Sequence, residues 1–161
     1  MYHHYLNTPD GFPKPYVHIS ADDEGVTSIY FVSEKKALES KSVITQQCAK
    51  ELQEYFKGKR VLFTVPLNIQ GTEFQKRVWQ QLCRIPYGEM WSYKQLALTL
   101  GSANYCRAVG MANSRNPISL IVPCHRVIGH DGKLVGYTGG LDIKGWLLEH
   151  EKNRKVKSKQ N

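Results

Sequence analysis

The sequence lacks the features that mark several large classes of protein. Its four cysteines form no C-x-x-C pair, which argues against a disulfide scaffold or a zinc ribbon and predicts reduced thiols. Its longest apolar runs, such as residues 119–122, fall far short of the ~18 residues of a membrane span. The N-terminus shows no secretory signal or transit peptide. We expect no membrane partner and a cytoplasmic protein, or a nuclear one if the organism is eukaryotic.

Acidic residues are scarce in the second part of the chain, and the net charge is +8. Residues 1–65 carry eight Lys/Arg against eight Asp/Glu, whereas residues 66–161 carry fourteen against six. Such an excess suits binding to a polyanion such as DNA. Five of the basic residues lie in 152–161, which is predicted to be a solvated, flexible tail. Without it the charge permits DNA binding but does not require it.

Length and hydrophobic patterning predict an α/β (α+β) chain, either one compact domain or two small, tightly packed ones. The first unit is expected at residues 1–70, where no functional site is recognisable. Its predicted elements are a β-hairpin, a helix and a further strand, at 17–19 with 27–32, at 42–56 and at 61–65.

Residues 71–151 are predicted to be mostly helical. Two capping boxes, Thr72-x-x-Gln75 and Ser92-x-x-Gln95, each open a helix. A glycine turn at Gly101 and a further helix at 103–113 complete the outline of a helix-turn-helix. The chain then continues through an apolar run, the sequence Pro-Cys-His-Arg, a glycine-rich loop and an amphipathic helix, at 118–122, 123–126, 129–140 and 143–151.

Cys124 is a candidate nucleophile because a histidine follows it. A thiol with a pKa near ~8.5 is mostly protonated at neutral pH and needs a base, which His125 can provide through a bridging water. A carboxylate on the far side of the imidazole would fix its tautomer, and Glu151 is a candidate for that role. Taken alone, a cysteine in such a run is more often a buried structural thiol.

The segment around this cysteine resembles a known family. Asn116-Pro-Ile-Ser-Leu-Ile-Val-Pro-Cys-His-Arg-Val-Ile-Gly129 is similar to the active-site signature of the O6-alkylguanine-DNA alkyltransferases, the methylated-DNA:protein-cysteine methyltransferases. Matching segments cover residues 71–151 nearly throughout, including Gly71–Trp79, Arg107–Gly110 and Gly136–Leu141. Residues 1–70 resemble the family only in length and in a strand-rich, ribonuclease-H-like character.

The resemblance implies DNA repair by direct reversal. Cys124 would accept an alkyl group from O6 of guanine in double-stranded DNA, irreversibly and once per molecule, and O4-alkylthymine is a second candidate substrate. His125 would act as the base and Glu151 would orient it. Asn116 would hold the turn between the recognition helix and a cysteine strand. Two further roles are implied, a hydrogen bond to the guanine ring from Tyr93 and an approach to O6 by Thr138, where the family often has serine.

The same resemblance implies that the damaged nucleotide rotates out of the duplex, because O6 is otherwise inside the base stack. Arg107 would fill the gap from the minor groove, and the small residues Ala108 and Gly110 would allow close approach. Taken alone, Arg107 is an ordinary exposed helix residue. The remaining residues expected to contact substrate or DNA are Ser92, Arg115, Arg126 and Tyr137.

Two other functions remain open. A non-enzymatic, alkyltransferase-like protein would bind the lesion without transfer, but such proteins typically lack the cysteine that this chain has. A helix-turn-helix regulator would use the major groove and would not need Cys124. No cofactor motif is present, the histidines and Cys48 show no zinc-ligand spacing, and we expect a monomer without metal.

Overall fold

The computed structural model describes residues 1–129, 131–132, 134, 136–137 and 139–160. Its chain divides into two compact units, residues 1–70 and 71–161, and each is described by itself. Their mixed helix and strand content confirms the predicted fold class. None of the described helices is long and apolar enough to cross a membrane.

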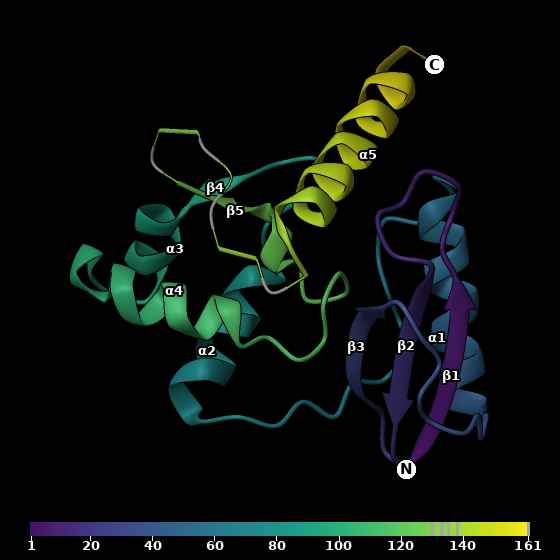
Figure 1. Ribbon diagram of the computed structural model, residues 1–161. Coiled ribbons are helices and arrows are strands. Elements are labelled where there is room, and N and C mark those ends of the chain that lie inside the picture. The colour runs from purple at the N-terminus through teal and green to yellow at the C-terminus, as the bar shows by residue number, and fades with distance from the viewer. Residues whose placement is uncertain (130, 133, 135, 138, 161) are drawn as a thin grey trace. The chain divides into compact units, whose positions relative to one another are not determined.

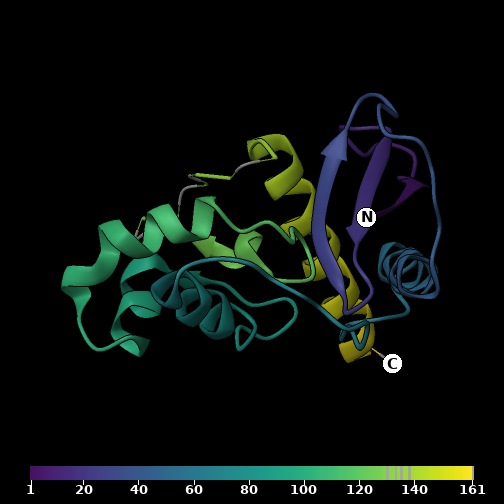
Figure 2. The ribbon, with the colours of Figure 1, turned by 90° about the horizontal axis from the view of Figure 1, so that it is seen from below.

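The first unit is a three-stranded antiparallel sheet with one helix against it (Figure 1). The strand order is β1-β2-β3, and the elements are β1 (Tyr2–Asn7), β2 (Tyr16–Ala21), β3 (Val26–Val32) and α1 (Val43–Phe56). Figure 2 shows α1 along one face of the sheet. Val17 and Ile19 of β2 are two positions apart and therefore lie on the same face of the sheet. Both are fully buried, as is Leu52 of α1, and these side chains belong to the core of the unit.

The sequence predictions for this unit are partly confirmed. The hairpin of β2 and β3 and the helix α1 are present, and Ser42 caps α1 as part of a capping box. The predicted strand at 61–65 is wrong. There the buried Glu51 carboxylate accepts hydrogen bonds from the backbone N–H groups of Thr64 (2.8 Å) and Val65 (3.1 Å), which a strand would have paired with a neighbour. Strand β1 was not predicted.

The second unit is mostly helical. Its main elements are α2 (Glu73–Leu82), β4 (Trp91–Ser92), α3 (Tyr93–Thr99), α4 (Cys106–Ser114), β5 (Val127–Ile128) and α5 (Leu141–Gln160), with 3-10 turns η1 (Ala103–Tyr105) and η2 (Cys124–Arg126). Both predicted capping boxes are present, at Thr72 and Ser92. In Figure 1 the parallel pair β4–β5 lies between the α3–α4 pair and α5.

Two predictions for this unit are wrong. The segment before Cys124 is buried but is not a strand; Cys124 opens the η2 turn, and only Val127 and Ile128 pair with β4. The last helix, predicted for residues 143–151, runs instead from Leu141 to Gln160. Lys, Arg and Gln are good helix formers, so α5 propagates past Glu151 where no Gly or Pro stops it.

Candidate active site

Backbone bonds and one buried asparagine fix the position of Cys124. The Asn116 amide donates to the carbonyl of Val122 (2.8 Å) and accepts from the N–H of Ile118 (3.0 Å). Asn116 is only 3% exposed, so these bonds do not compete with water. Its amide therefore holds the segment that leads into η2, which matches the turn-holding role expected for it.

His125 and Glu151 meet as the sequence predicted. The His125 Nε2 and the Glu151 Oε2 are 2.7 Å apart, and both side chains are buried, at 0% and 1% exposure. A carboxylate accepts from this nitrogen, so the neutral imidazole carries its proton on Nε2. The other nitrogen, Nδ1, has no hydrogen-bond partner among the described residues. His125 is therefore built to accept a proton on Nδ1.

Arg126, which the sequence had placed at the DNA surface, is engaged inside the protein. It is buried, and its Nε donates to Glu151 Oε1 (2.8 Å) while Nη2 donates to Oε2 (3.1 Å). A third bond runs from Nη1 to the carbonyl of Ile85 (2.8 Å). To reach a phosphate, Arg126 would have to leave the Glu151 carboxylate buried without its cation, which is strongly unfavourable. Its prediction as a DNA contact is therefore wrong.

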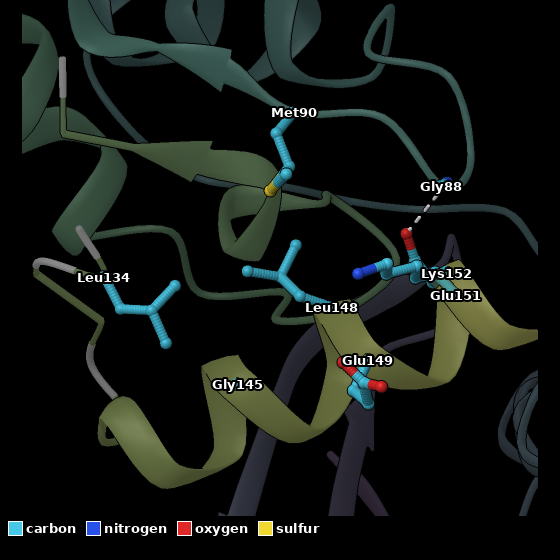
Figure 3. Close-up of a pocket in the computed structure, with 8 residues that line it drawn as sticks. All are labelled: Gly88, Met90, Leu134, Gly145, Leu148, Glu149, Glu151 and Lys152. Atoms are coloured by element: carbon cyan, nitrogen blue, oxygen red, sulfur yellow. Dashed lines mark hydrogen bonds between the residues drawn. The ribbon is translucent and has the colours of Figure 1, made fainter. Parts of the chain in front are cut away.

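Glu151 also faces a cleft on the side of α5. Its Oε1 accepts a weaker bond from the Gly88 N–H (3.3 Å), drawn as a dashed line in Figure 3. The cleft has a volume of about 520 Å³ and is lined mainly by Met90, Leu134 and Leu148. Cys124 is not among the described residues that line this cleft.

The electrostatics favour a neutral thiol beside a neutral imidazole. Burial raises the pKa of the Cys124 thiol to about 11, although a hydrogen bond from Asn116 and the charge of Lys144 act in the opposite direction. Burial also lowers the pKa of His125, against the influence of Glu151. The sulfur therefore stays protonated until a base takes its proton, and the base is in its accepting form at neutral pH.

Lys144 is a charged neighbour that the sequence reasoning missed. It lies in the first turn of α5 and is 0% exposed. Burial lowers its pKa to about 8, although the nearby Cys124 acts to raise it. A signal was present in the sequence, because Lys144, Leu147 and Glu151 are spaced to share one helix face. A lysine on the buried face of a helix needs a specific reason.

Tyr93 lies at the start of α3, beside the glycine-rich loop. A Cβ built on Gly136 would come within 3.2 Å of the Tyr93 Oη, so the loop backbone passes close to this hydroxyl. Gly136 also has a positive φ of 54°, a conformation that favours glycine. On α4, the buried Asn113 donates to the carbonyl of Cys124 (3.5 Å) and links this helix to η2. Asn113 had not been predicted as a site residue.

The residues expected at the DNA surface are spread over several elements, and three of them lie on α4. Arg107 and Ala108 are exposed on α4, Arg115 is exposed at its C-cap, and Gly110 is half-buried beside Tyr93. Ser92 caps α3, where its hydroxyl accepts from the N–H of Gln95. Two expected residues come from the glycine-rich loop, of which Tyr137 is half-buried and Thr138 lies outside the described residues. Within the part of the chain that the structure describes, no three metal-binding side chains gather.

Known proteins resemble the chain along its whole length. Residues 73–153 match the 6-O-methylguanine DNA methyltransferase DNA-binding domain, and residues 1–69 match its ribonuclease-like domain. A methylated-DNA–protein-cysteine methyltransferase of Methanosarcina barkeri is 43% identical over 159 residues, which cover 95% of this chain and 98% of the relative. The chain belongs to the methylated-DNA–protein-cysteine methyltransferase family.

Solved structures of this methyltransferase family agree with the assignment. The Mycobacterium tuberculosis O6-methylguanine methyltransferase aligns with a TM-score of 0.83 at 37% identity, over 95% of this chain and 93% of that one. The M. tuberculosis protein in complex with DNA aligns with a TM-score of 0.85 at 37% identity, over 96% and 94%. The family resemblance seen in the sequence is confirmed, and so is the ribonuclease-like character of the first unit.

Proposed function

We propose that this chain repairs double-stranded DNA by moving an alkyl group from O6 of guanine onto Cys124, once per molecule. One observation supports the proposal above all others: next to Cys124, the buried His125 donates from Nε2 to Glu151 and keeps Nδ1 available as an acceptor. Membership of the methyltransferase family supplies the reaction class. We assign the steps of that reaction to residues on the basis of this geometry.

The reaction begins with a proton transfer. The thiol proton of Cys124 passes through a bridging water to Nδ1 of His125, and Glu151 stabilises the imidazolium that forms. The sulfur attacks the alkyl carbon, so a C–S bond forms while the C–O6 bond breaks and its electron pair stays on O6. Tyr93 donates a hydrogen bond to the purine anion, and the proton that left the sulfur finally restores neutral guanine.

The product explains why each molecule would act once. Transfer leaves a thioether at Cys124, which has no proton to lose and is a poor leaving group. The proposed transfer needs no cofactor, because the sulfur is the acceptor and His125 is the base. The alkylated protein is therefore an end product of the reaction.

Access of guanine to the sulfur requires that the nucleotide leave the duplex, at a cost of a few kcal/mol. Helix α4 presents the exposed Arg107 and Ala108 on its surface. We assign this face to the minor groove, with Arg107 filling the space left by the base and the small side chain of Ala108 allowing close approach. The positive charge of the second unit would supply most of the affinity, which should be sensitive to salt and indifferent to sequence.

A mass measurement tests the proposal. Incubation with duplex DNA that contains O6-methylguanine should add one methyl group to the peptide that holds Cys124. Cys124→Ala should bind the lesion and show no transfer, whereas Cys83→Ala, at an exposed cysteine, should react as the unmodified protein does. An unmodified Cys124 peptide, or transfer by Cys124→Ala, would overturn the assignment. O6-benzylguanine and O4-methylthymine in the same assay define the range of substrates.

A further inference from the structure

We infer that Arg126 is a positioning residue for the transfer reaction. Its guanidinium fixes the Glu151 carboxylate and compensates its charge, so that His125 stays neutral and ready to accept the thiol proton. This inference rests on the proposed function of Cys124 and His125. It assigns a role in the chemistry to a residue that the sequence had placed at the DNA surface.

The first support is the geometry around the carboxylate. Oε1 of Glu151 accepts from Arg126 Nε (2.8 Å) and from the Gly88 N–H (3.3 Å), and Oε2 accepts from His125 Nε2 (2.7 Å) and Arg126 Nη2 (3.1 Å). The two oxygens of a carboxylate offer about four lone-pair sites. These donors engage all of them, so Glu151 cannot rotate away from the imidazole without losing bonds.

The second support is the anchor at the other end of the guanidinium. Arg126 Nη1 donates to the backbone carbonyl of Ile85 (2.8 Å), which follows helix α2. A planar guanidinium with one edge on a carboxylate and another nitrogen on a backbone carbonyl has a fixed orientation. Arg126 thus links the backbone at Ile85 to the Glu151 carboxylate, and this carboxylate in turn orients His125. A lysine could supply the charge, but it could not supply this fork of donors.

The third support is the balance of charge on Glu151. If the Glu151 carboxylate faced only the imidazole, its negative charge would favour the protonated imidazolium form of His125. An opposite charge within ~4–6 Å stabilises the charged state of a titratable group. An imidazolium has no acceptor nitrogen and cannot take the thiol proton. Arg126 already compensates the carboxylate, and together with His125 it keeps the pKa of Glu151 below its ordinary range despite burial. The imidazole can therefore remain neutral.

The other titratable neighbours do not replace this effect. Lys144 carries a positive charge that, like Arg126, disfavours the imidazolium. Burial raises the pKa of Tyr87, whose ring lies 5.6 Å from the guanidinium carbon of Arg126 and of Arg154, to about 12. Burial also raises the pKa of Tyr137. Both phenols are neutral between pH 5 and pH 9 on these shifts. Arg126, in contrast, is a permanent cation that donates two hydrogen bonds to the carboxylate.

The test compares Arg126→Met and Arg126→Lys with Arg84→Met, a matched control at an exposed arginine of the same unit. Two quantities are measured on folded protein: the single-turnover rate of Cys124 methylation against pH, and the pKa of His125 by NMR of labelled imidazole. In Arg126→Met we expect the His125 pKa and the acid limb of the rate profile to move upward together, by about one pH unit. Arg126→Lys should move both less, and Arg84→Met should move neither.

A role in packing alone would give a different result. If Arg126→Met slows transfer equally at every pH and leaves the His125 pKa unchanged, the inference is wrong. If Arg126→Met does not fold, Arg126→Lys provides the test. Its His125 pKa and the acid limb of its rate profile must then both lie above those of the unmodified protein. The NMR measurement needs no DNA, so it tests Arg126 separately. If the unmodified protein shows no methylation at Cys124, the proposed function fails by itself.

Discussion

At the scale of single residues, the active site is a compromise between burial and charge. Burial protects the Cys124 thiol from unspecific chemistry, but it also raises the pKa of that thiol to about 11. The neighbouring cation of Lys144 opposes this shift. Lys144 is itself fully buried, and burial lowers its pKa to about 8. The charge of Lys144 therefore favours the thiolate of Cys124, while the burial of that same charge costs stability.

Replacement of Lys144 tests this compromise through the reaction rate. Lys144→Met should slow the methylation of Cys124 about tenfold at neutral pH, because the charge of Lys144 lowers the pKa of the Cys124 thiol and its loss makes the thiolate harder to form. Lys59→Met removes the same charge from an exposed position in the first unit and serves as the control for DNA binding. Equal single-turnover rates in the two variants would show that Lys144 does not act on the sulfur.

The same substitution should raise the stability of the fold. The pKa of Lys144 falls from 10.5 to about 8 on burial, so the unfolded chain binds the proton more tightly than the folded one does. The resulting cost, about 3 kcal/mol, is fully present below pH 8 and disappears as the pH rises toward 10.5. We expect Lys144→Met to increase the free energy of unfolding by roughly 1–3 kcal/mol at pH 7 in urea titrations. A decrease would contradict this account.

Asn116 illustrates the opposite case, a polar residue that stabilises the site. Asn116→Ala would leave the N–H of Ile118 buried without its acceptor, at a cost of about 1–3 kcal/mol. The carbonyl of Val122 would lose one bond but would still accept from the N–H of Cys124 (2.8 Å). Urea unfolding should show this loss, and Asn104→Ala, in an exposed turn, should stay within about 0.5 kcal/mol of the unmodified protein. A small effect at Asn116 would mean that water or a shifted backbone replaces its bonds.

Sequence reasoning found the residues of the site better than it found their partners. Cys124 and His125 stand in a distinctive run, and the structure places Glu151 against His125 as expected. Arg126 was misassigned because an arginine beside a reactive cysteine looks the same in sequence whether it faces DNA or a buried carboxylate. Arg126 and Glu151 are 25 positions apart in the sequence, and their contact forms only in the folded chain. The sequence around Arg126 therefore does not reveal its partner.

At the scale of elements, helix starts and the hairpin of β2 and β3 were predicted reliably, whereas the pairing of β1 was missed and the strand at 61–65 was wrong. The capping boxes at Ser42, Thr72 and Ser92 open helices because each satisfies backbone donors within four residues. Strand β1 was not predicted because its sequence, Tyr-His-His-Tyr-Leu-Asn, has little apolar alternation; pairing with β2 fixes it. The wrong strand at 61–65 has a good β-branched pattern but no partner strand.

Glu51 is the element-scale reason for that exception, and it can be tested. Its carboxylate accepts from both the N–H and the hydroxyl of Thr64 and from the N–H of Val65, so one side chain replaces a strand neighbour. Glu51→Ala should lower the free energy of unfolding by about 1–3 kcal/mol, because the buried N–H of Val65 and the two part-buried donors of Thr64 lose their acceptor. Glu24→Ala, at an exposed turn, is the control. Equal unfolding midpoints would contradict the role given to Glu51.

At the scale of the whole molecule, the buried acids and bases predict how stability depends on pH. The pKa of His125 is lowered by burial, and the pKa of Glu151 is lowered because its charged neighbours outweigh burial. In the first unit, hydrogen bonds to the Glu51 carboxylate likewise outweigh burial and lower its pKa. For all three groups the unfolded chain binds protons more readily than the folded chain does. Stability is therefore fully present at neutral pH and lost on acidification.

The order of these losses follows from the ordinary pKa values of the groups. Loss should begin as the pH falls below about 6.5, when His125 of the unfolded chain takes up a proton, and should steepen below about 4.5, when the carboxylates do so. Urea unfolding midpoints at pH 7, 5.5 and 4 measure the trend. Glu151→Gln leaves the Arg126 charge buried alone, so the variant should be less stable by about 3–5 kcal/mol at pH 7.

The informative comparison is therefore the slope of stability against pH and not its absolute value. Glu151→Gln removes one carboxylate whose pKa is lowered in the folded protein, so its free energy of unfolding should fall less between pH 5.5 and pH 4 than that of the unmodified protein. Glu149→Gln, at an exposed position of the same helix, should keep the original slope. If Glu151→Gln keeps that slope too, Glu151 does not stay ionised through this range, and the charge balance assigned to Arg126 and His125 loses its basis.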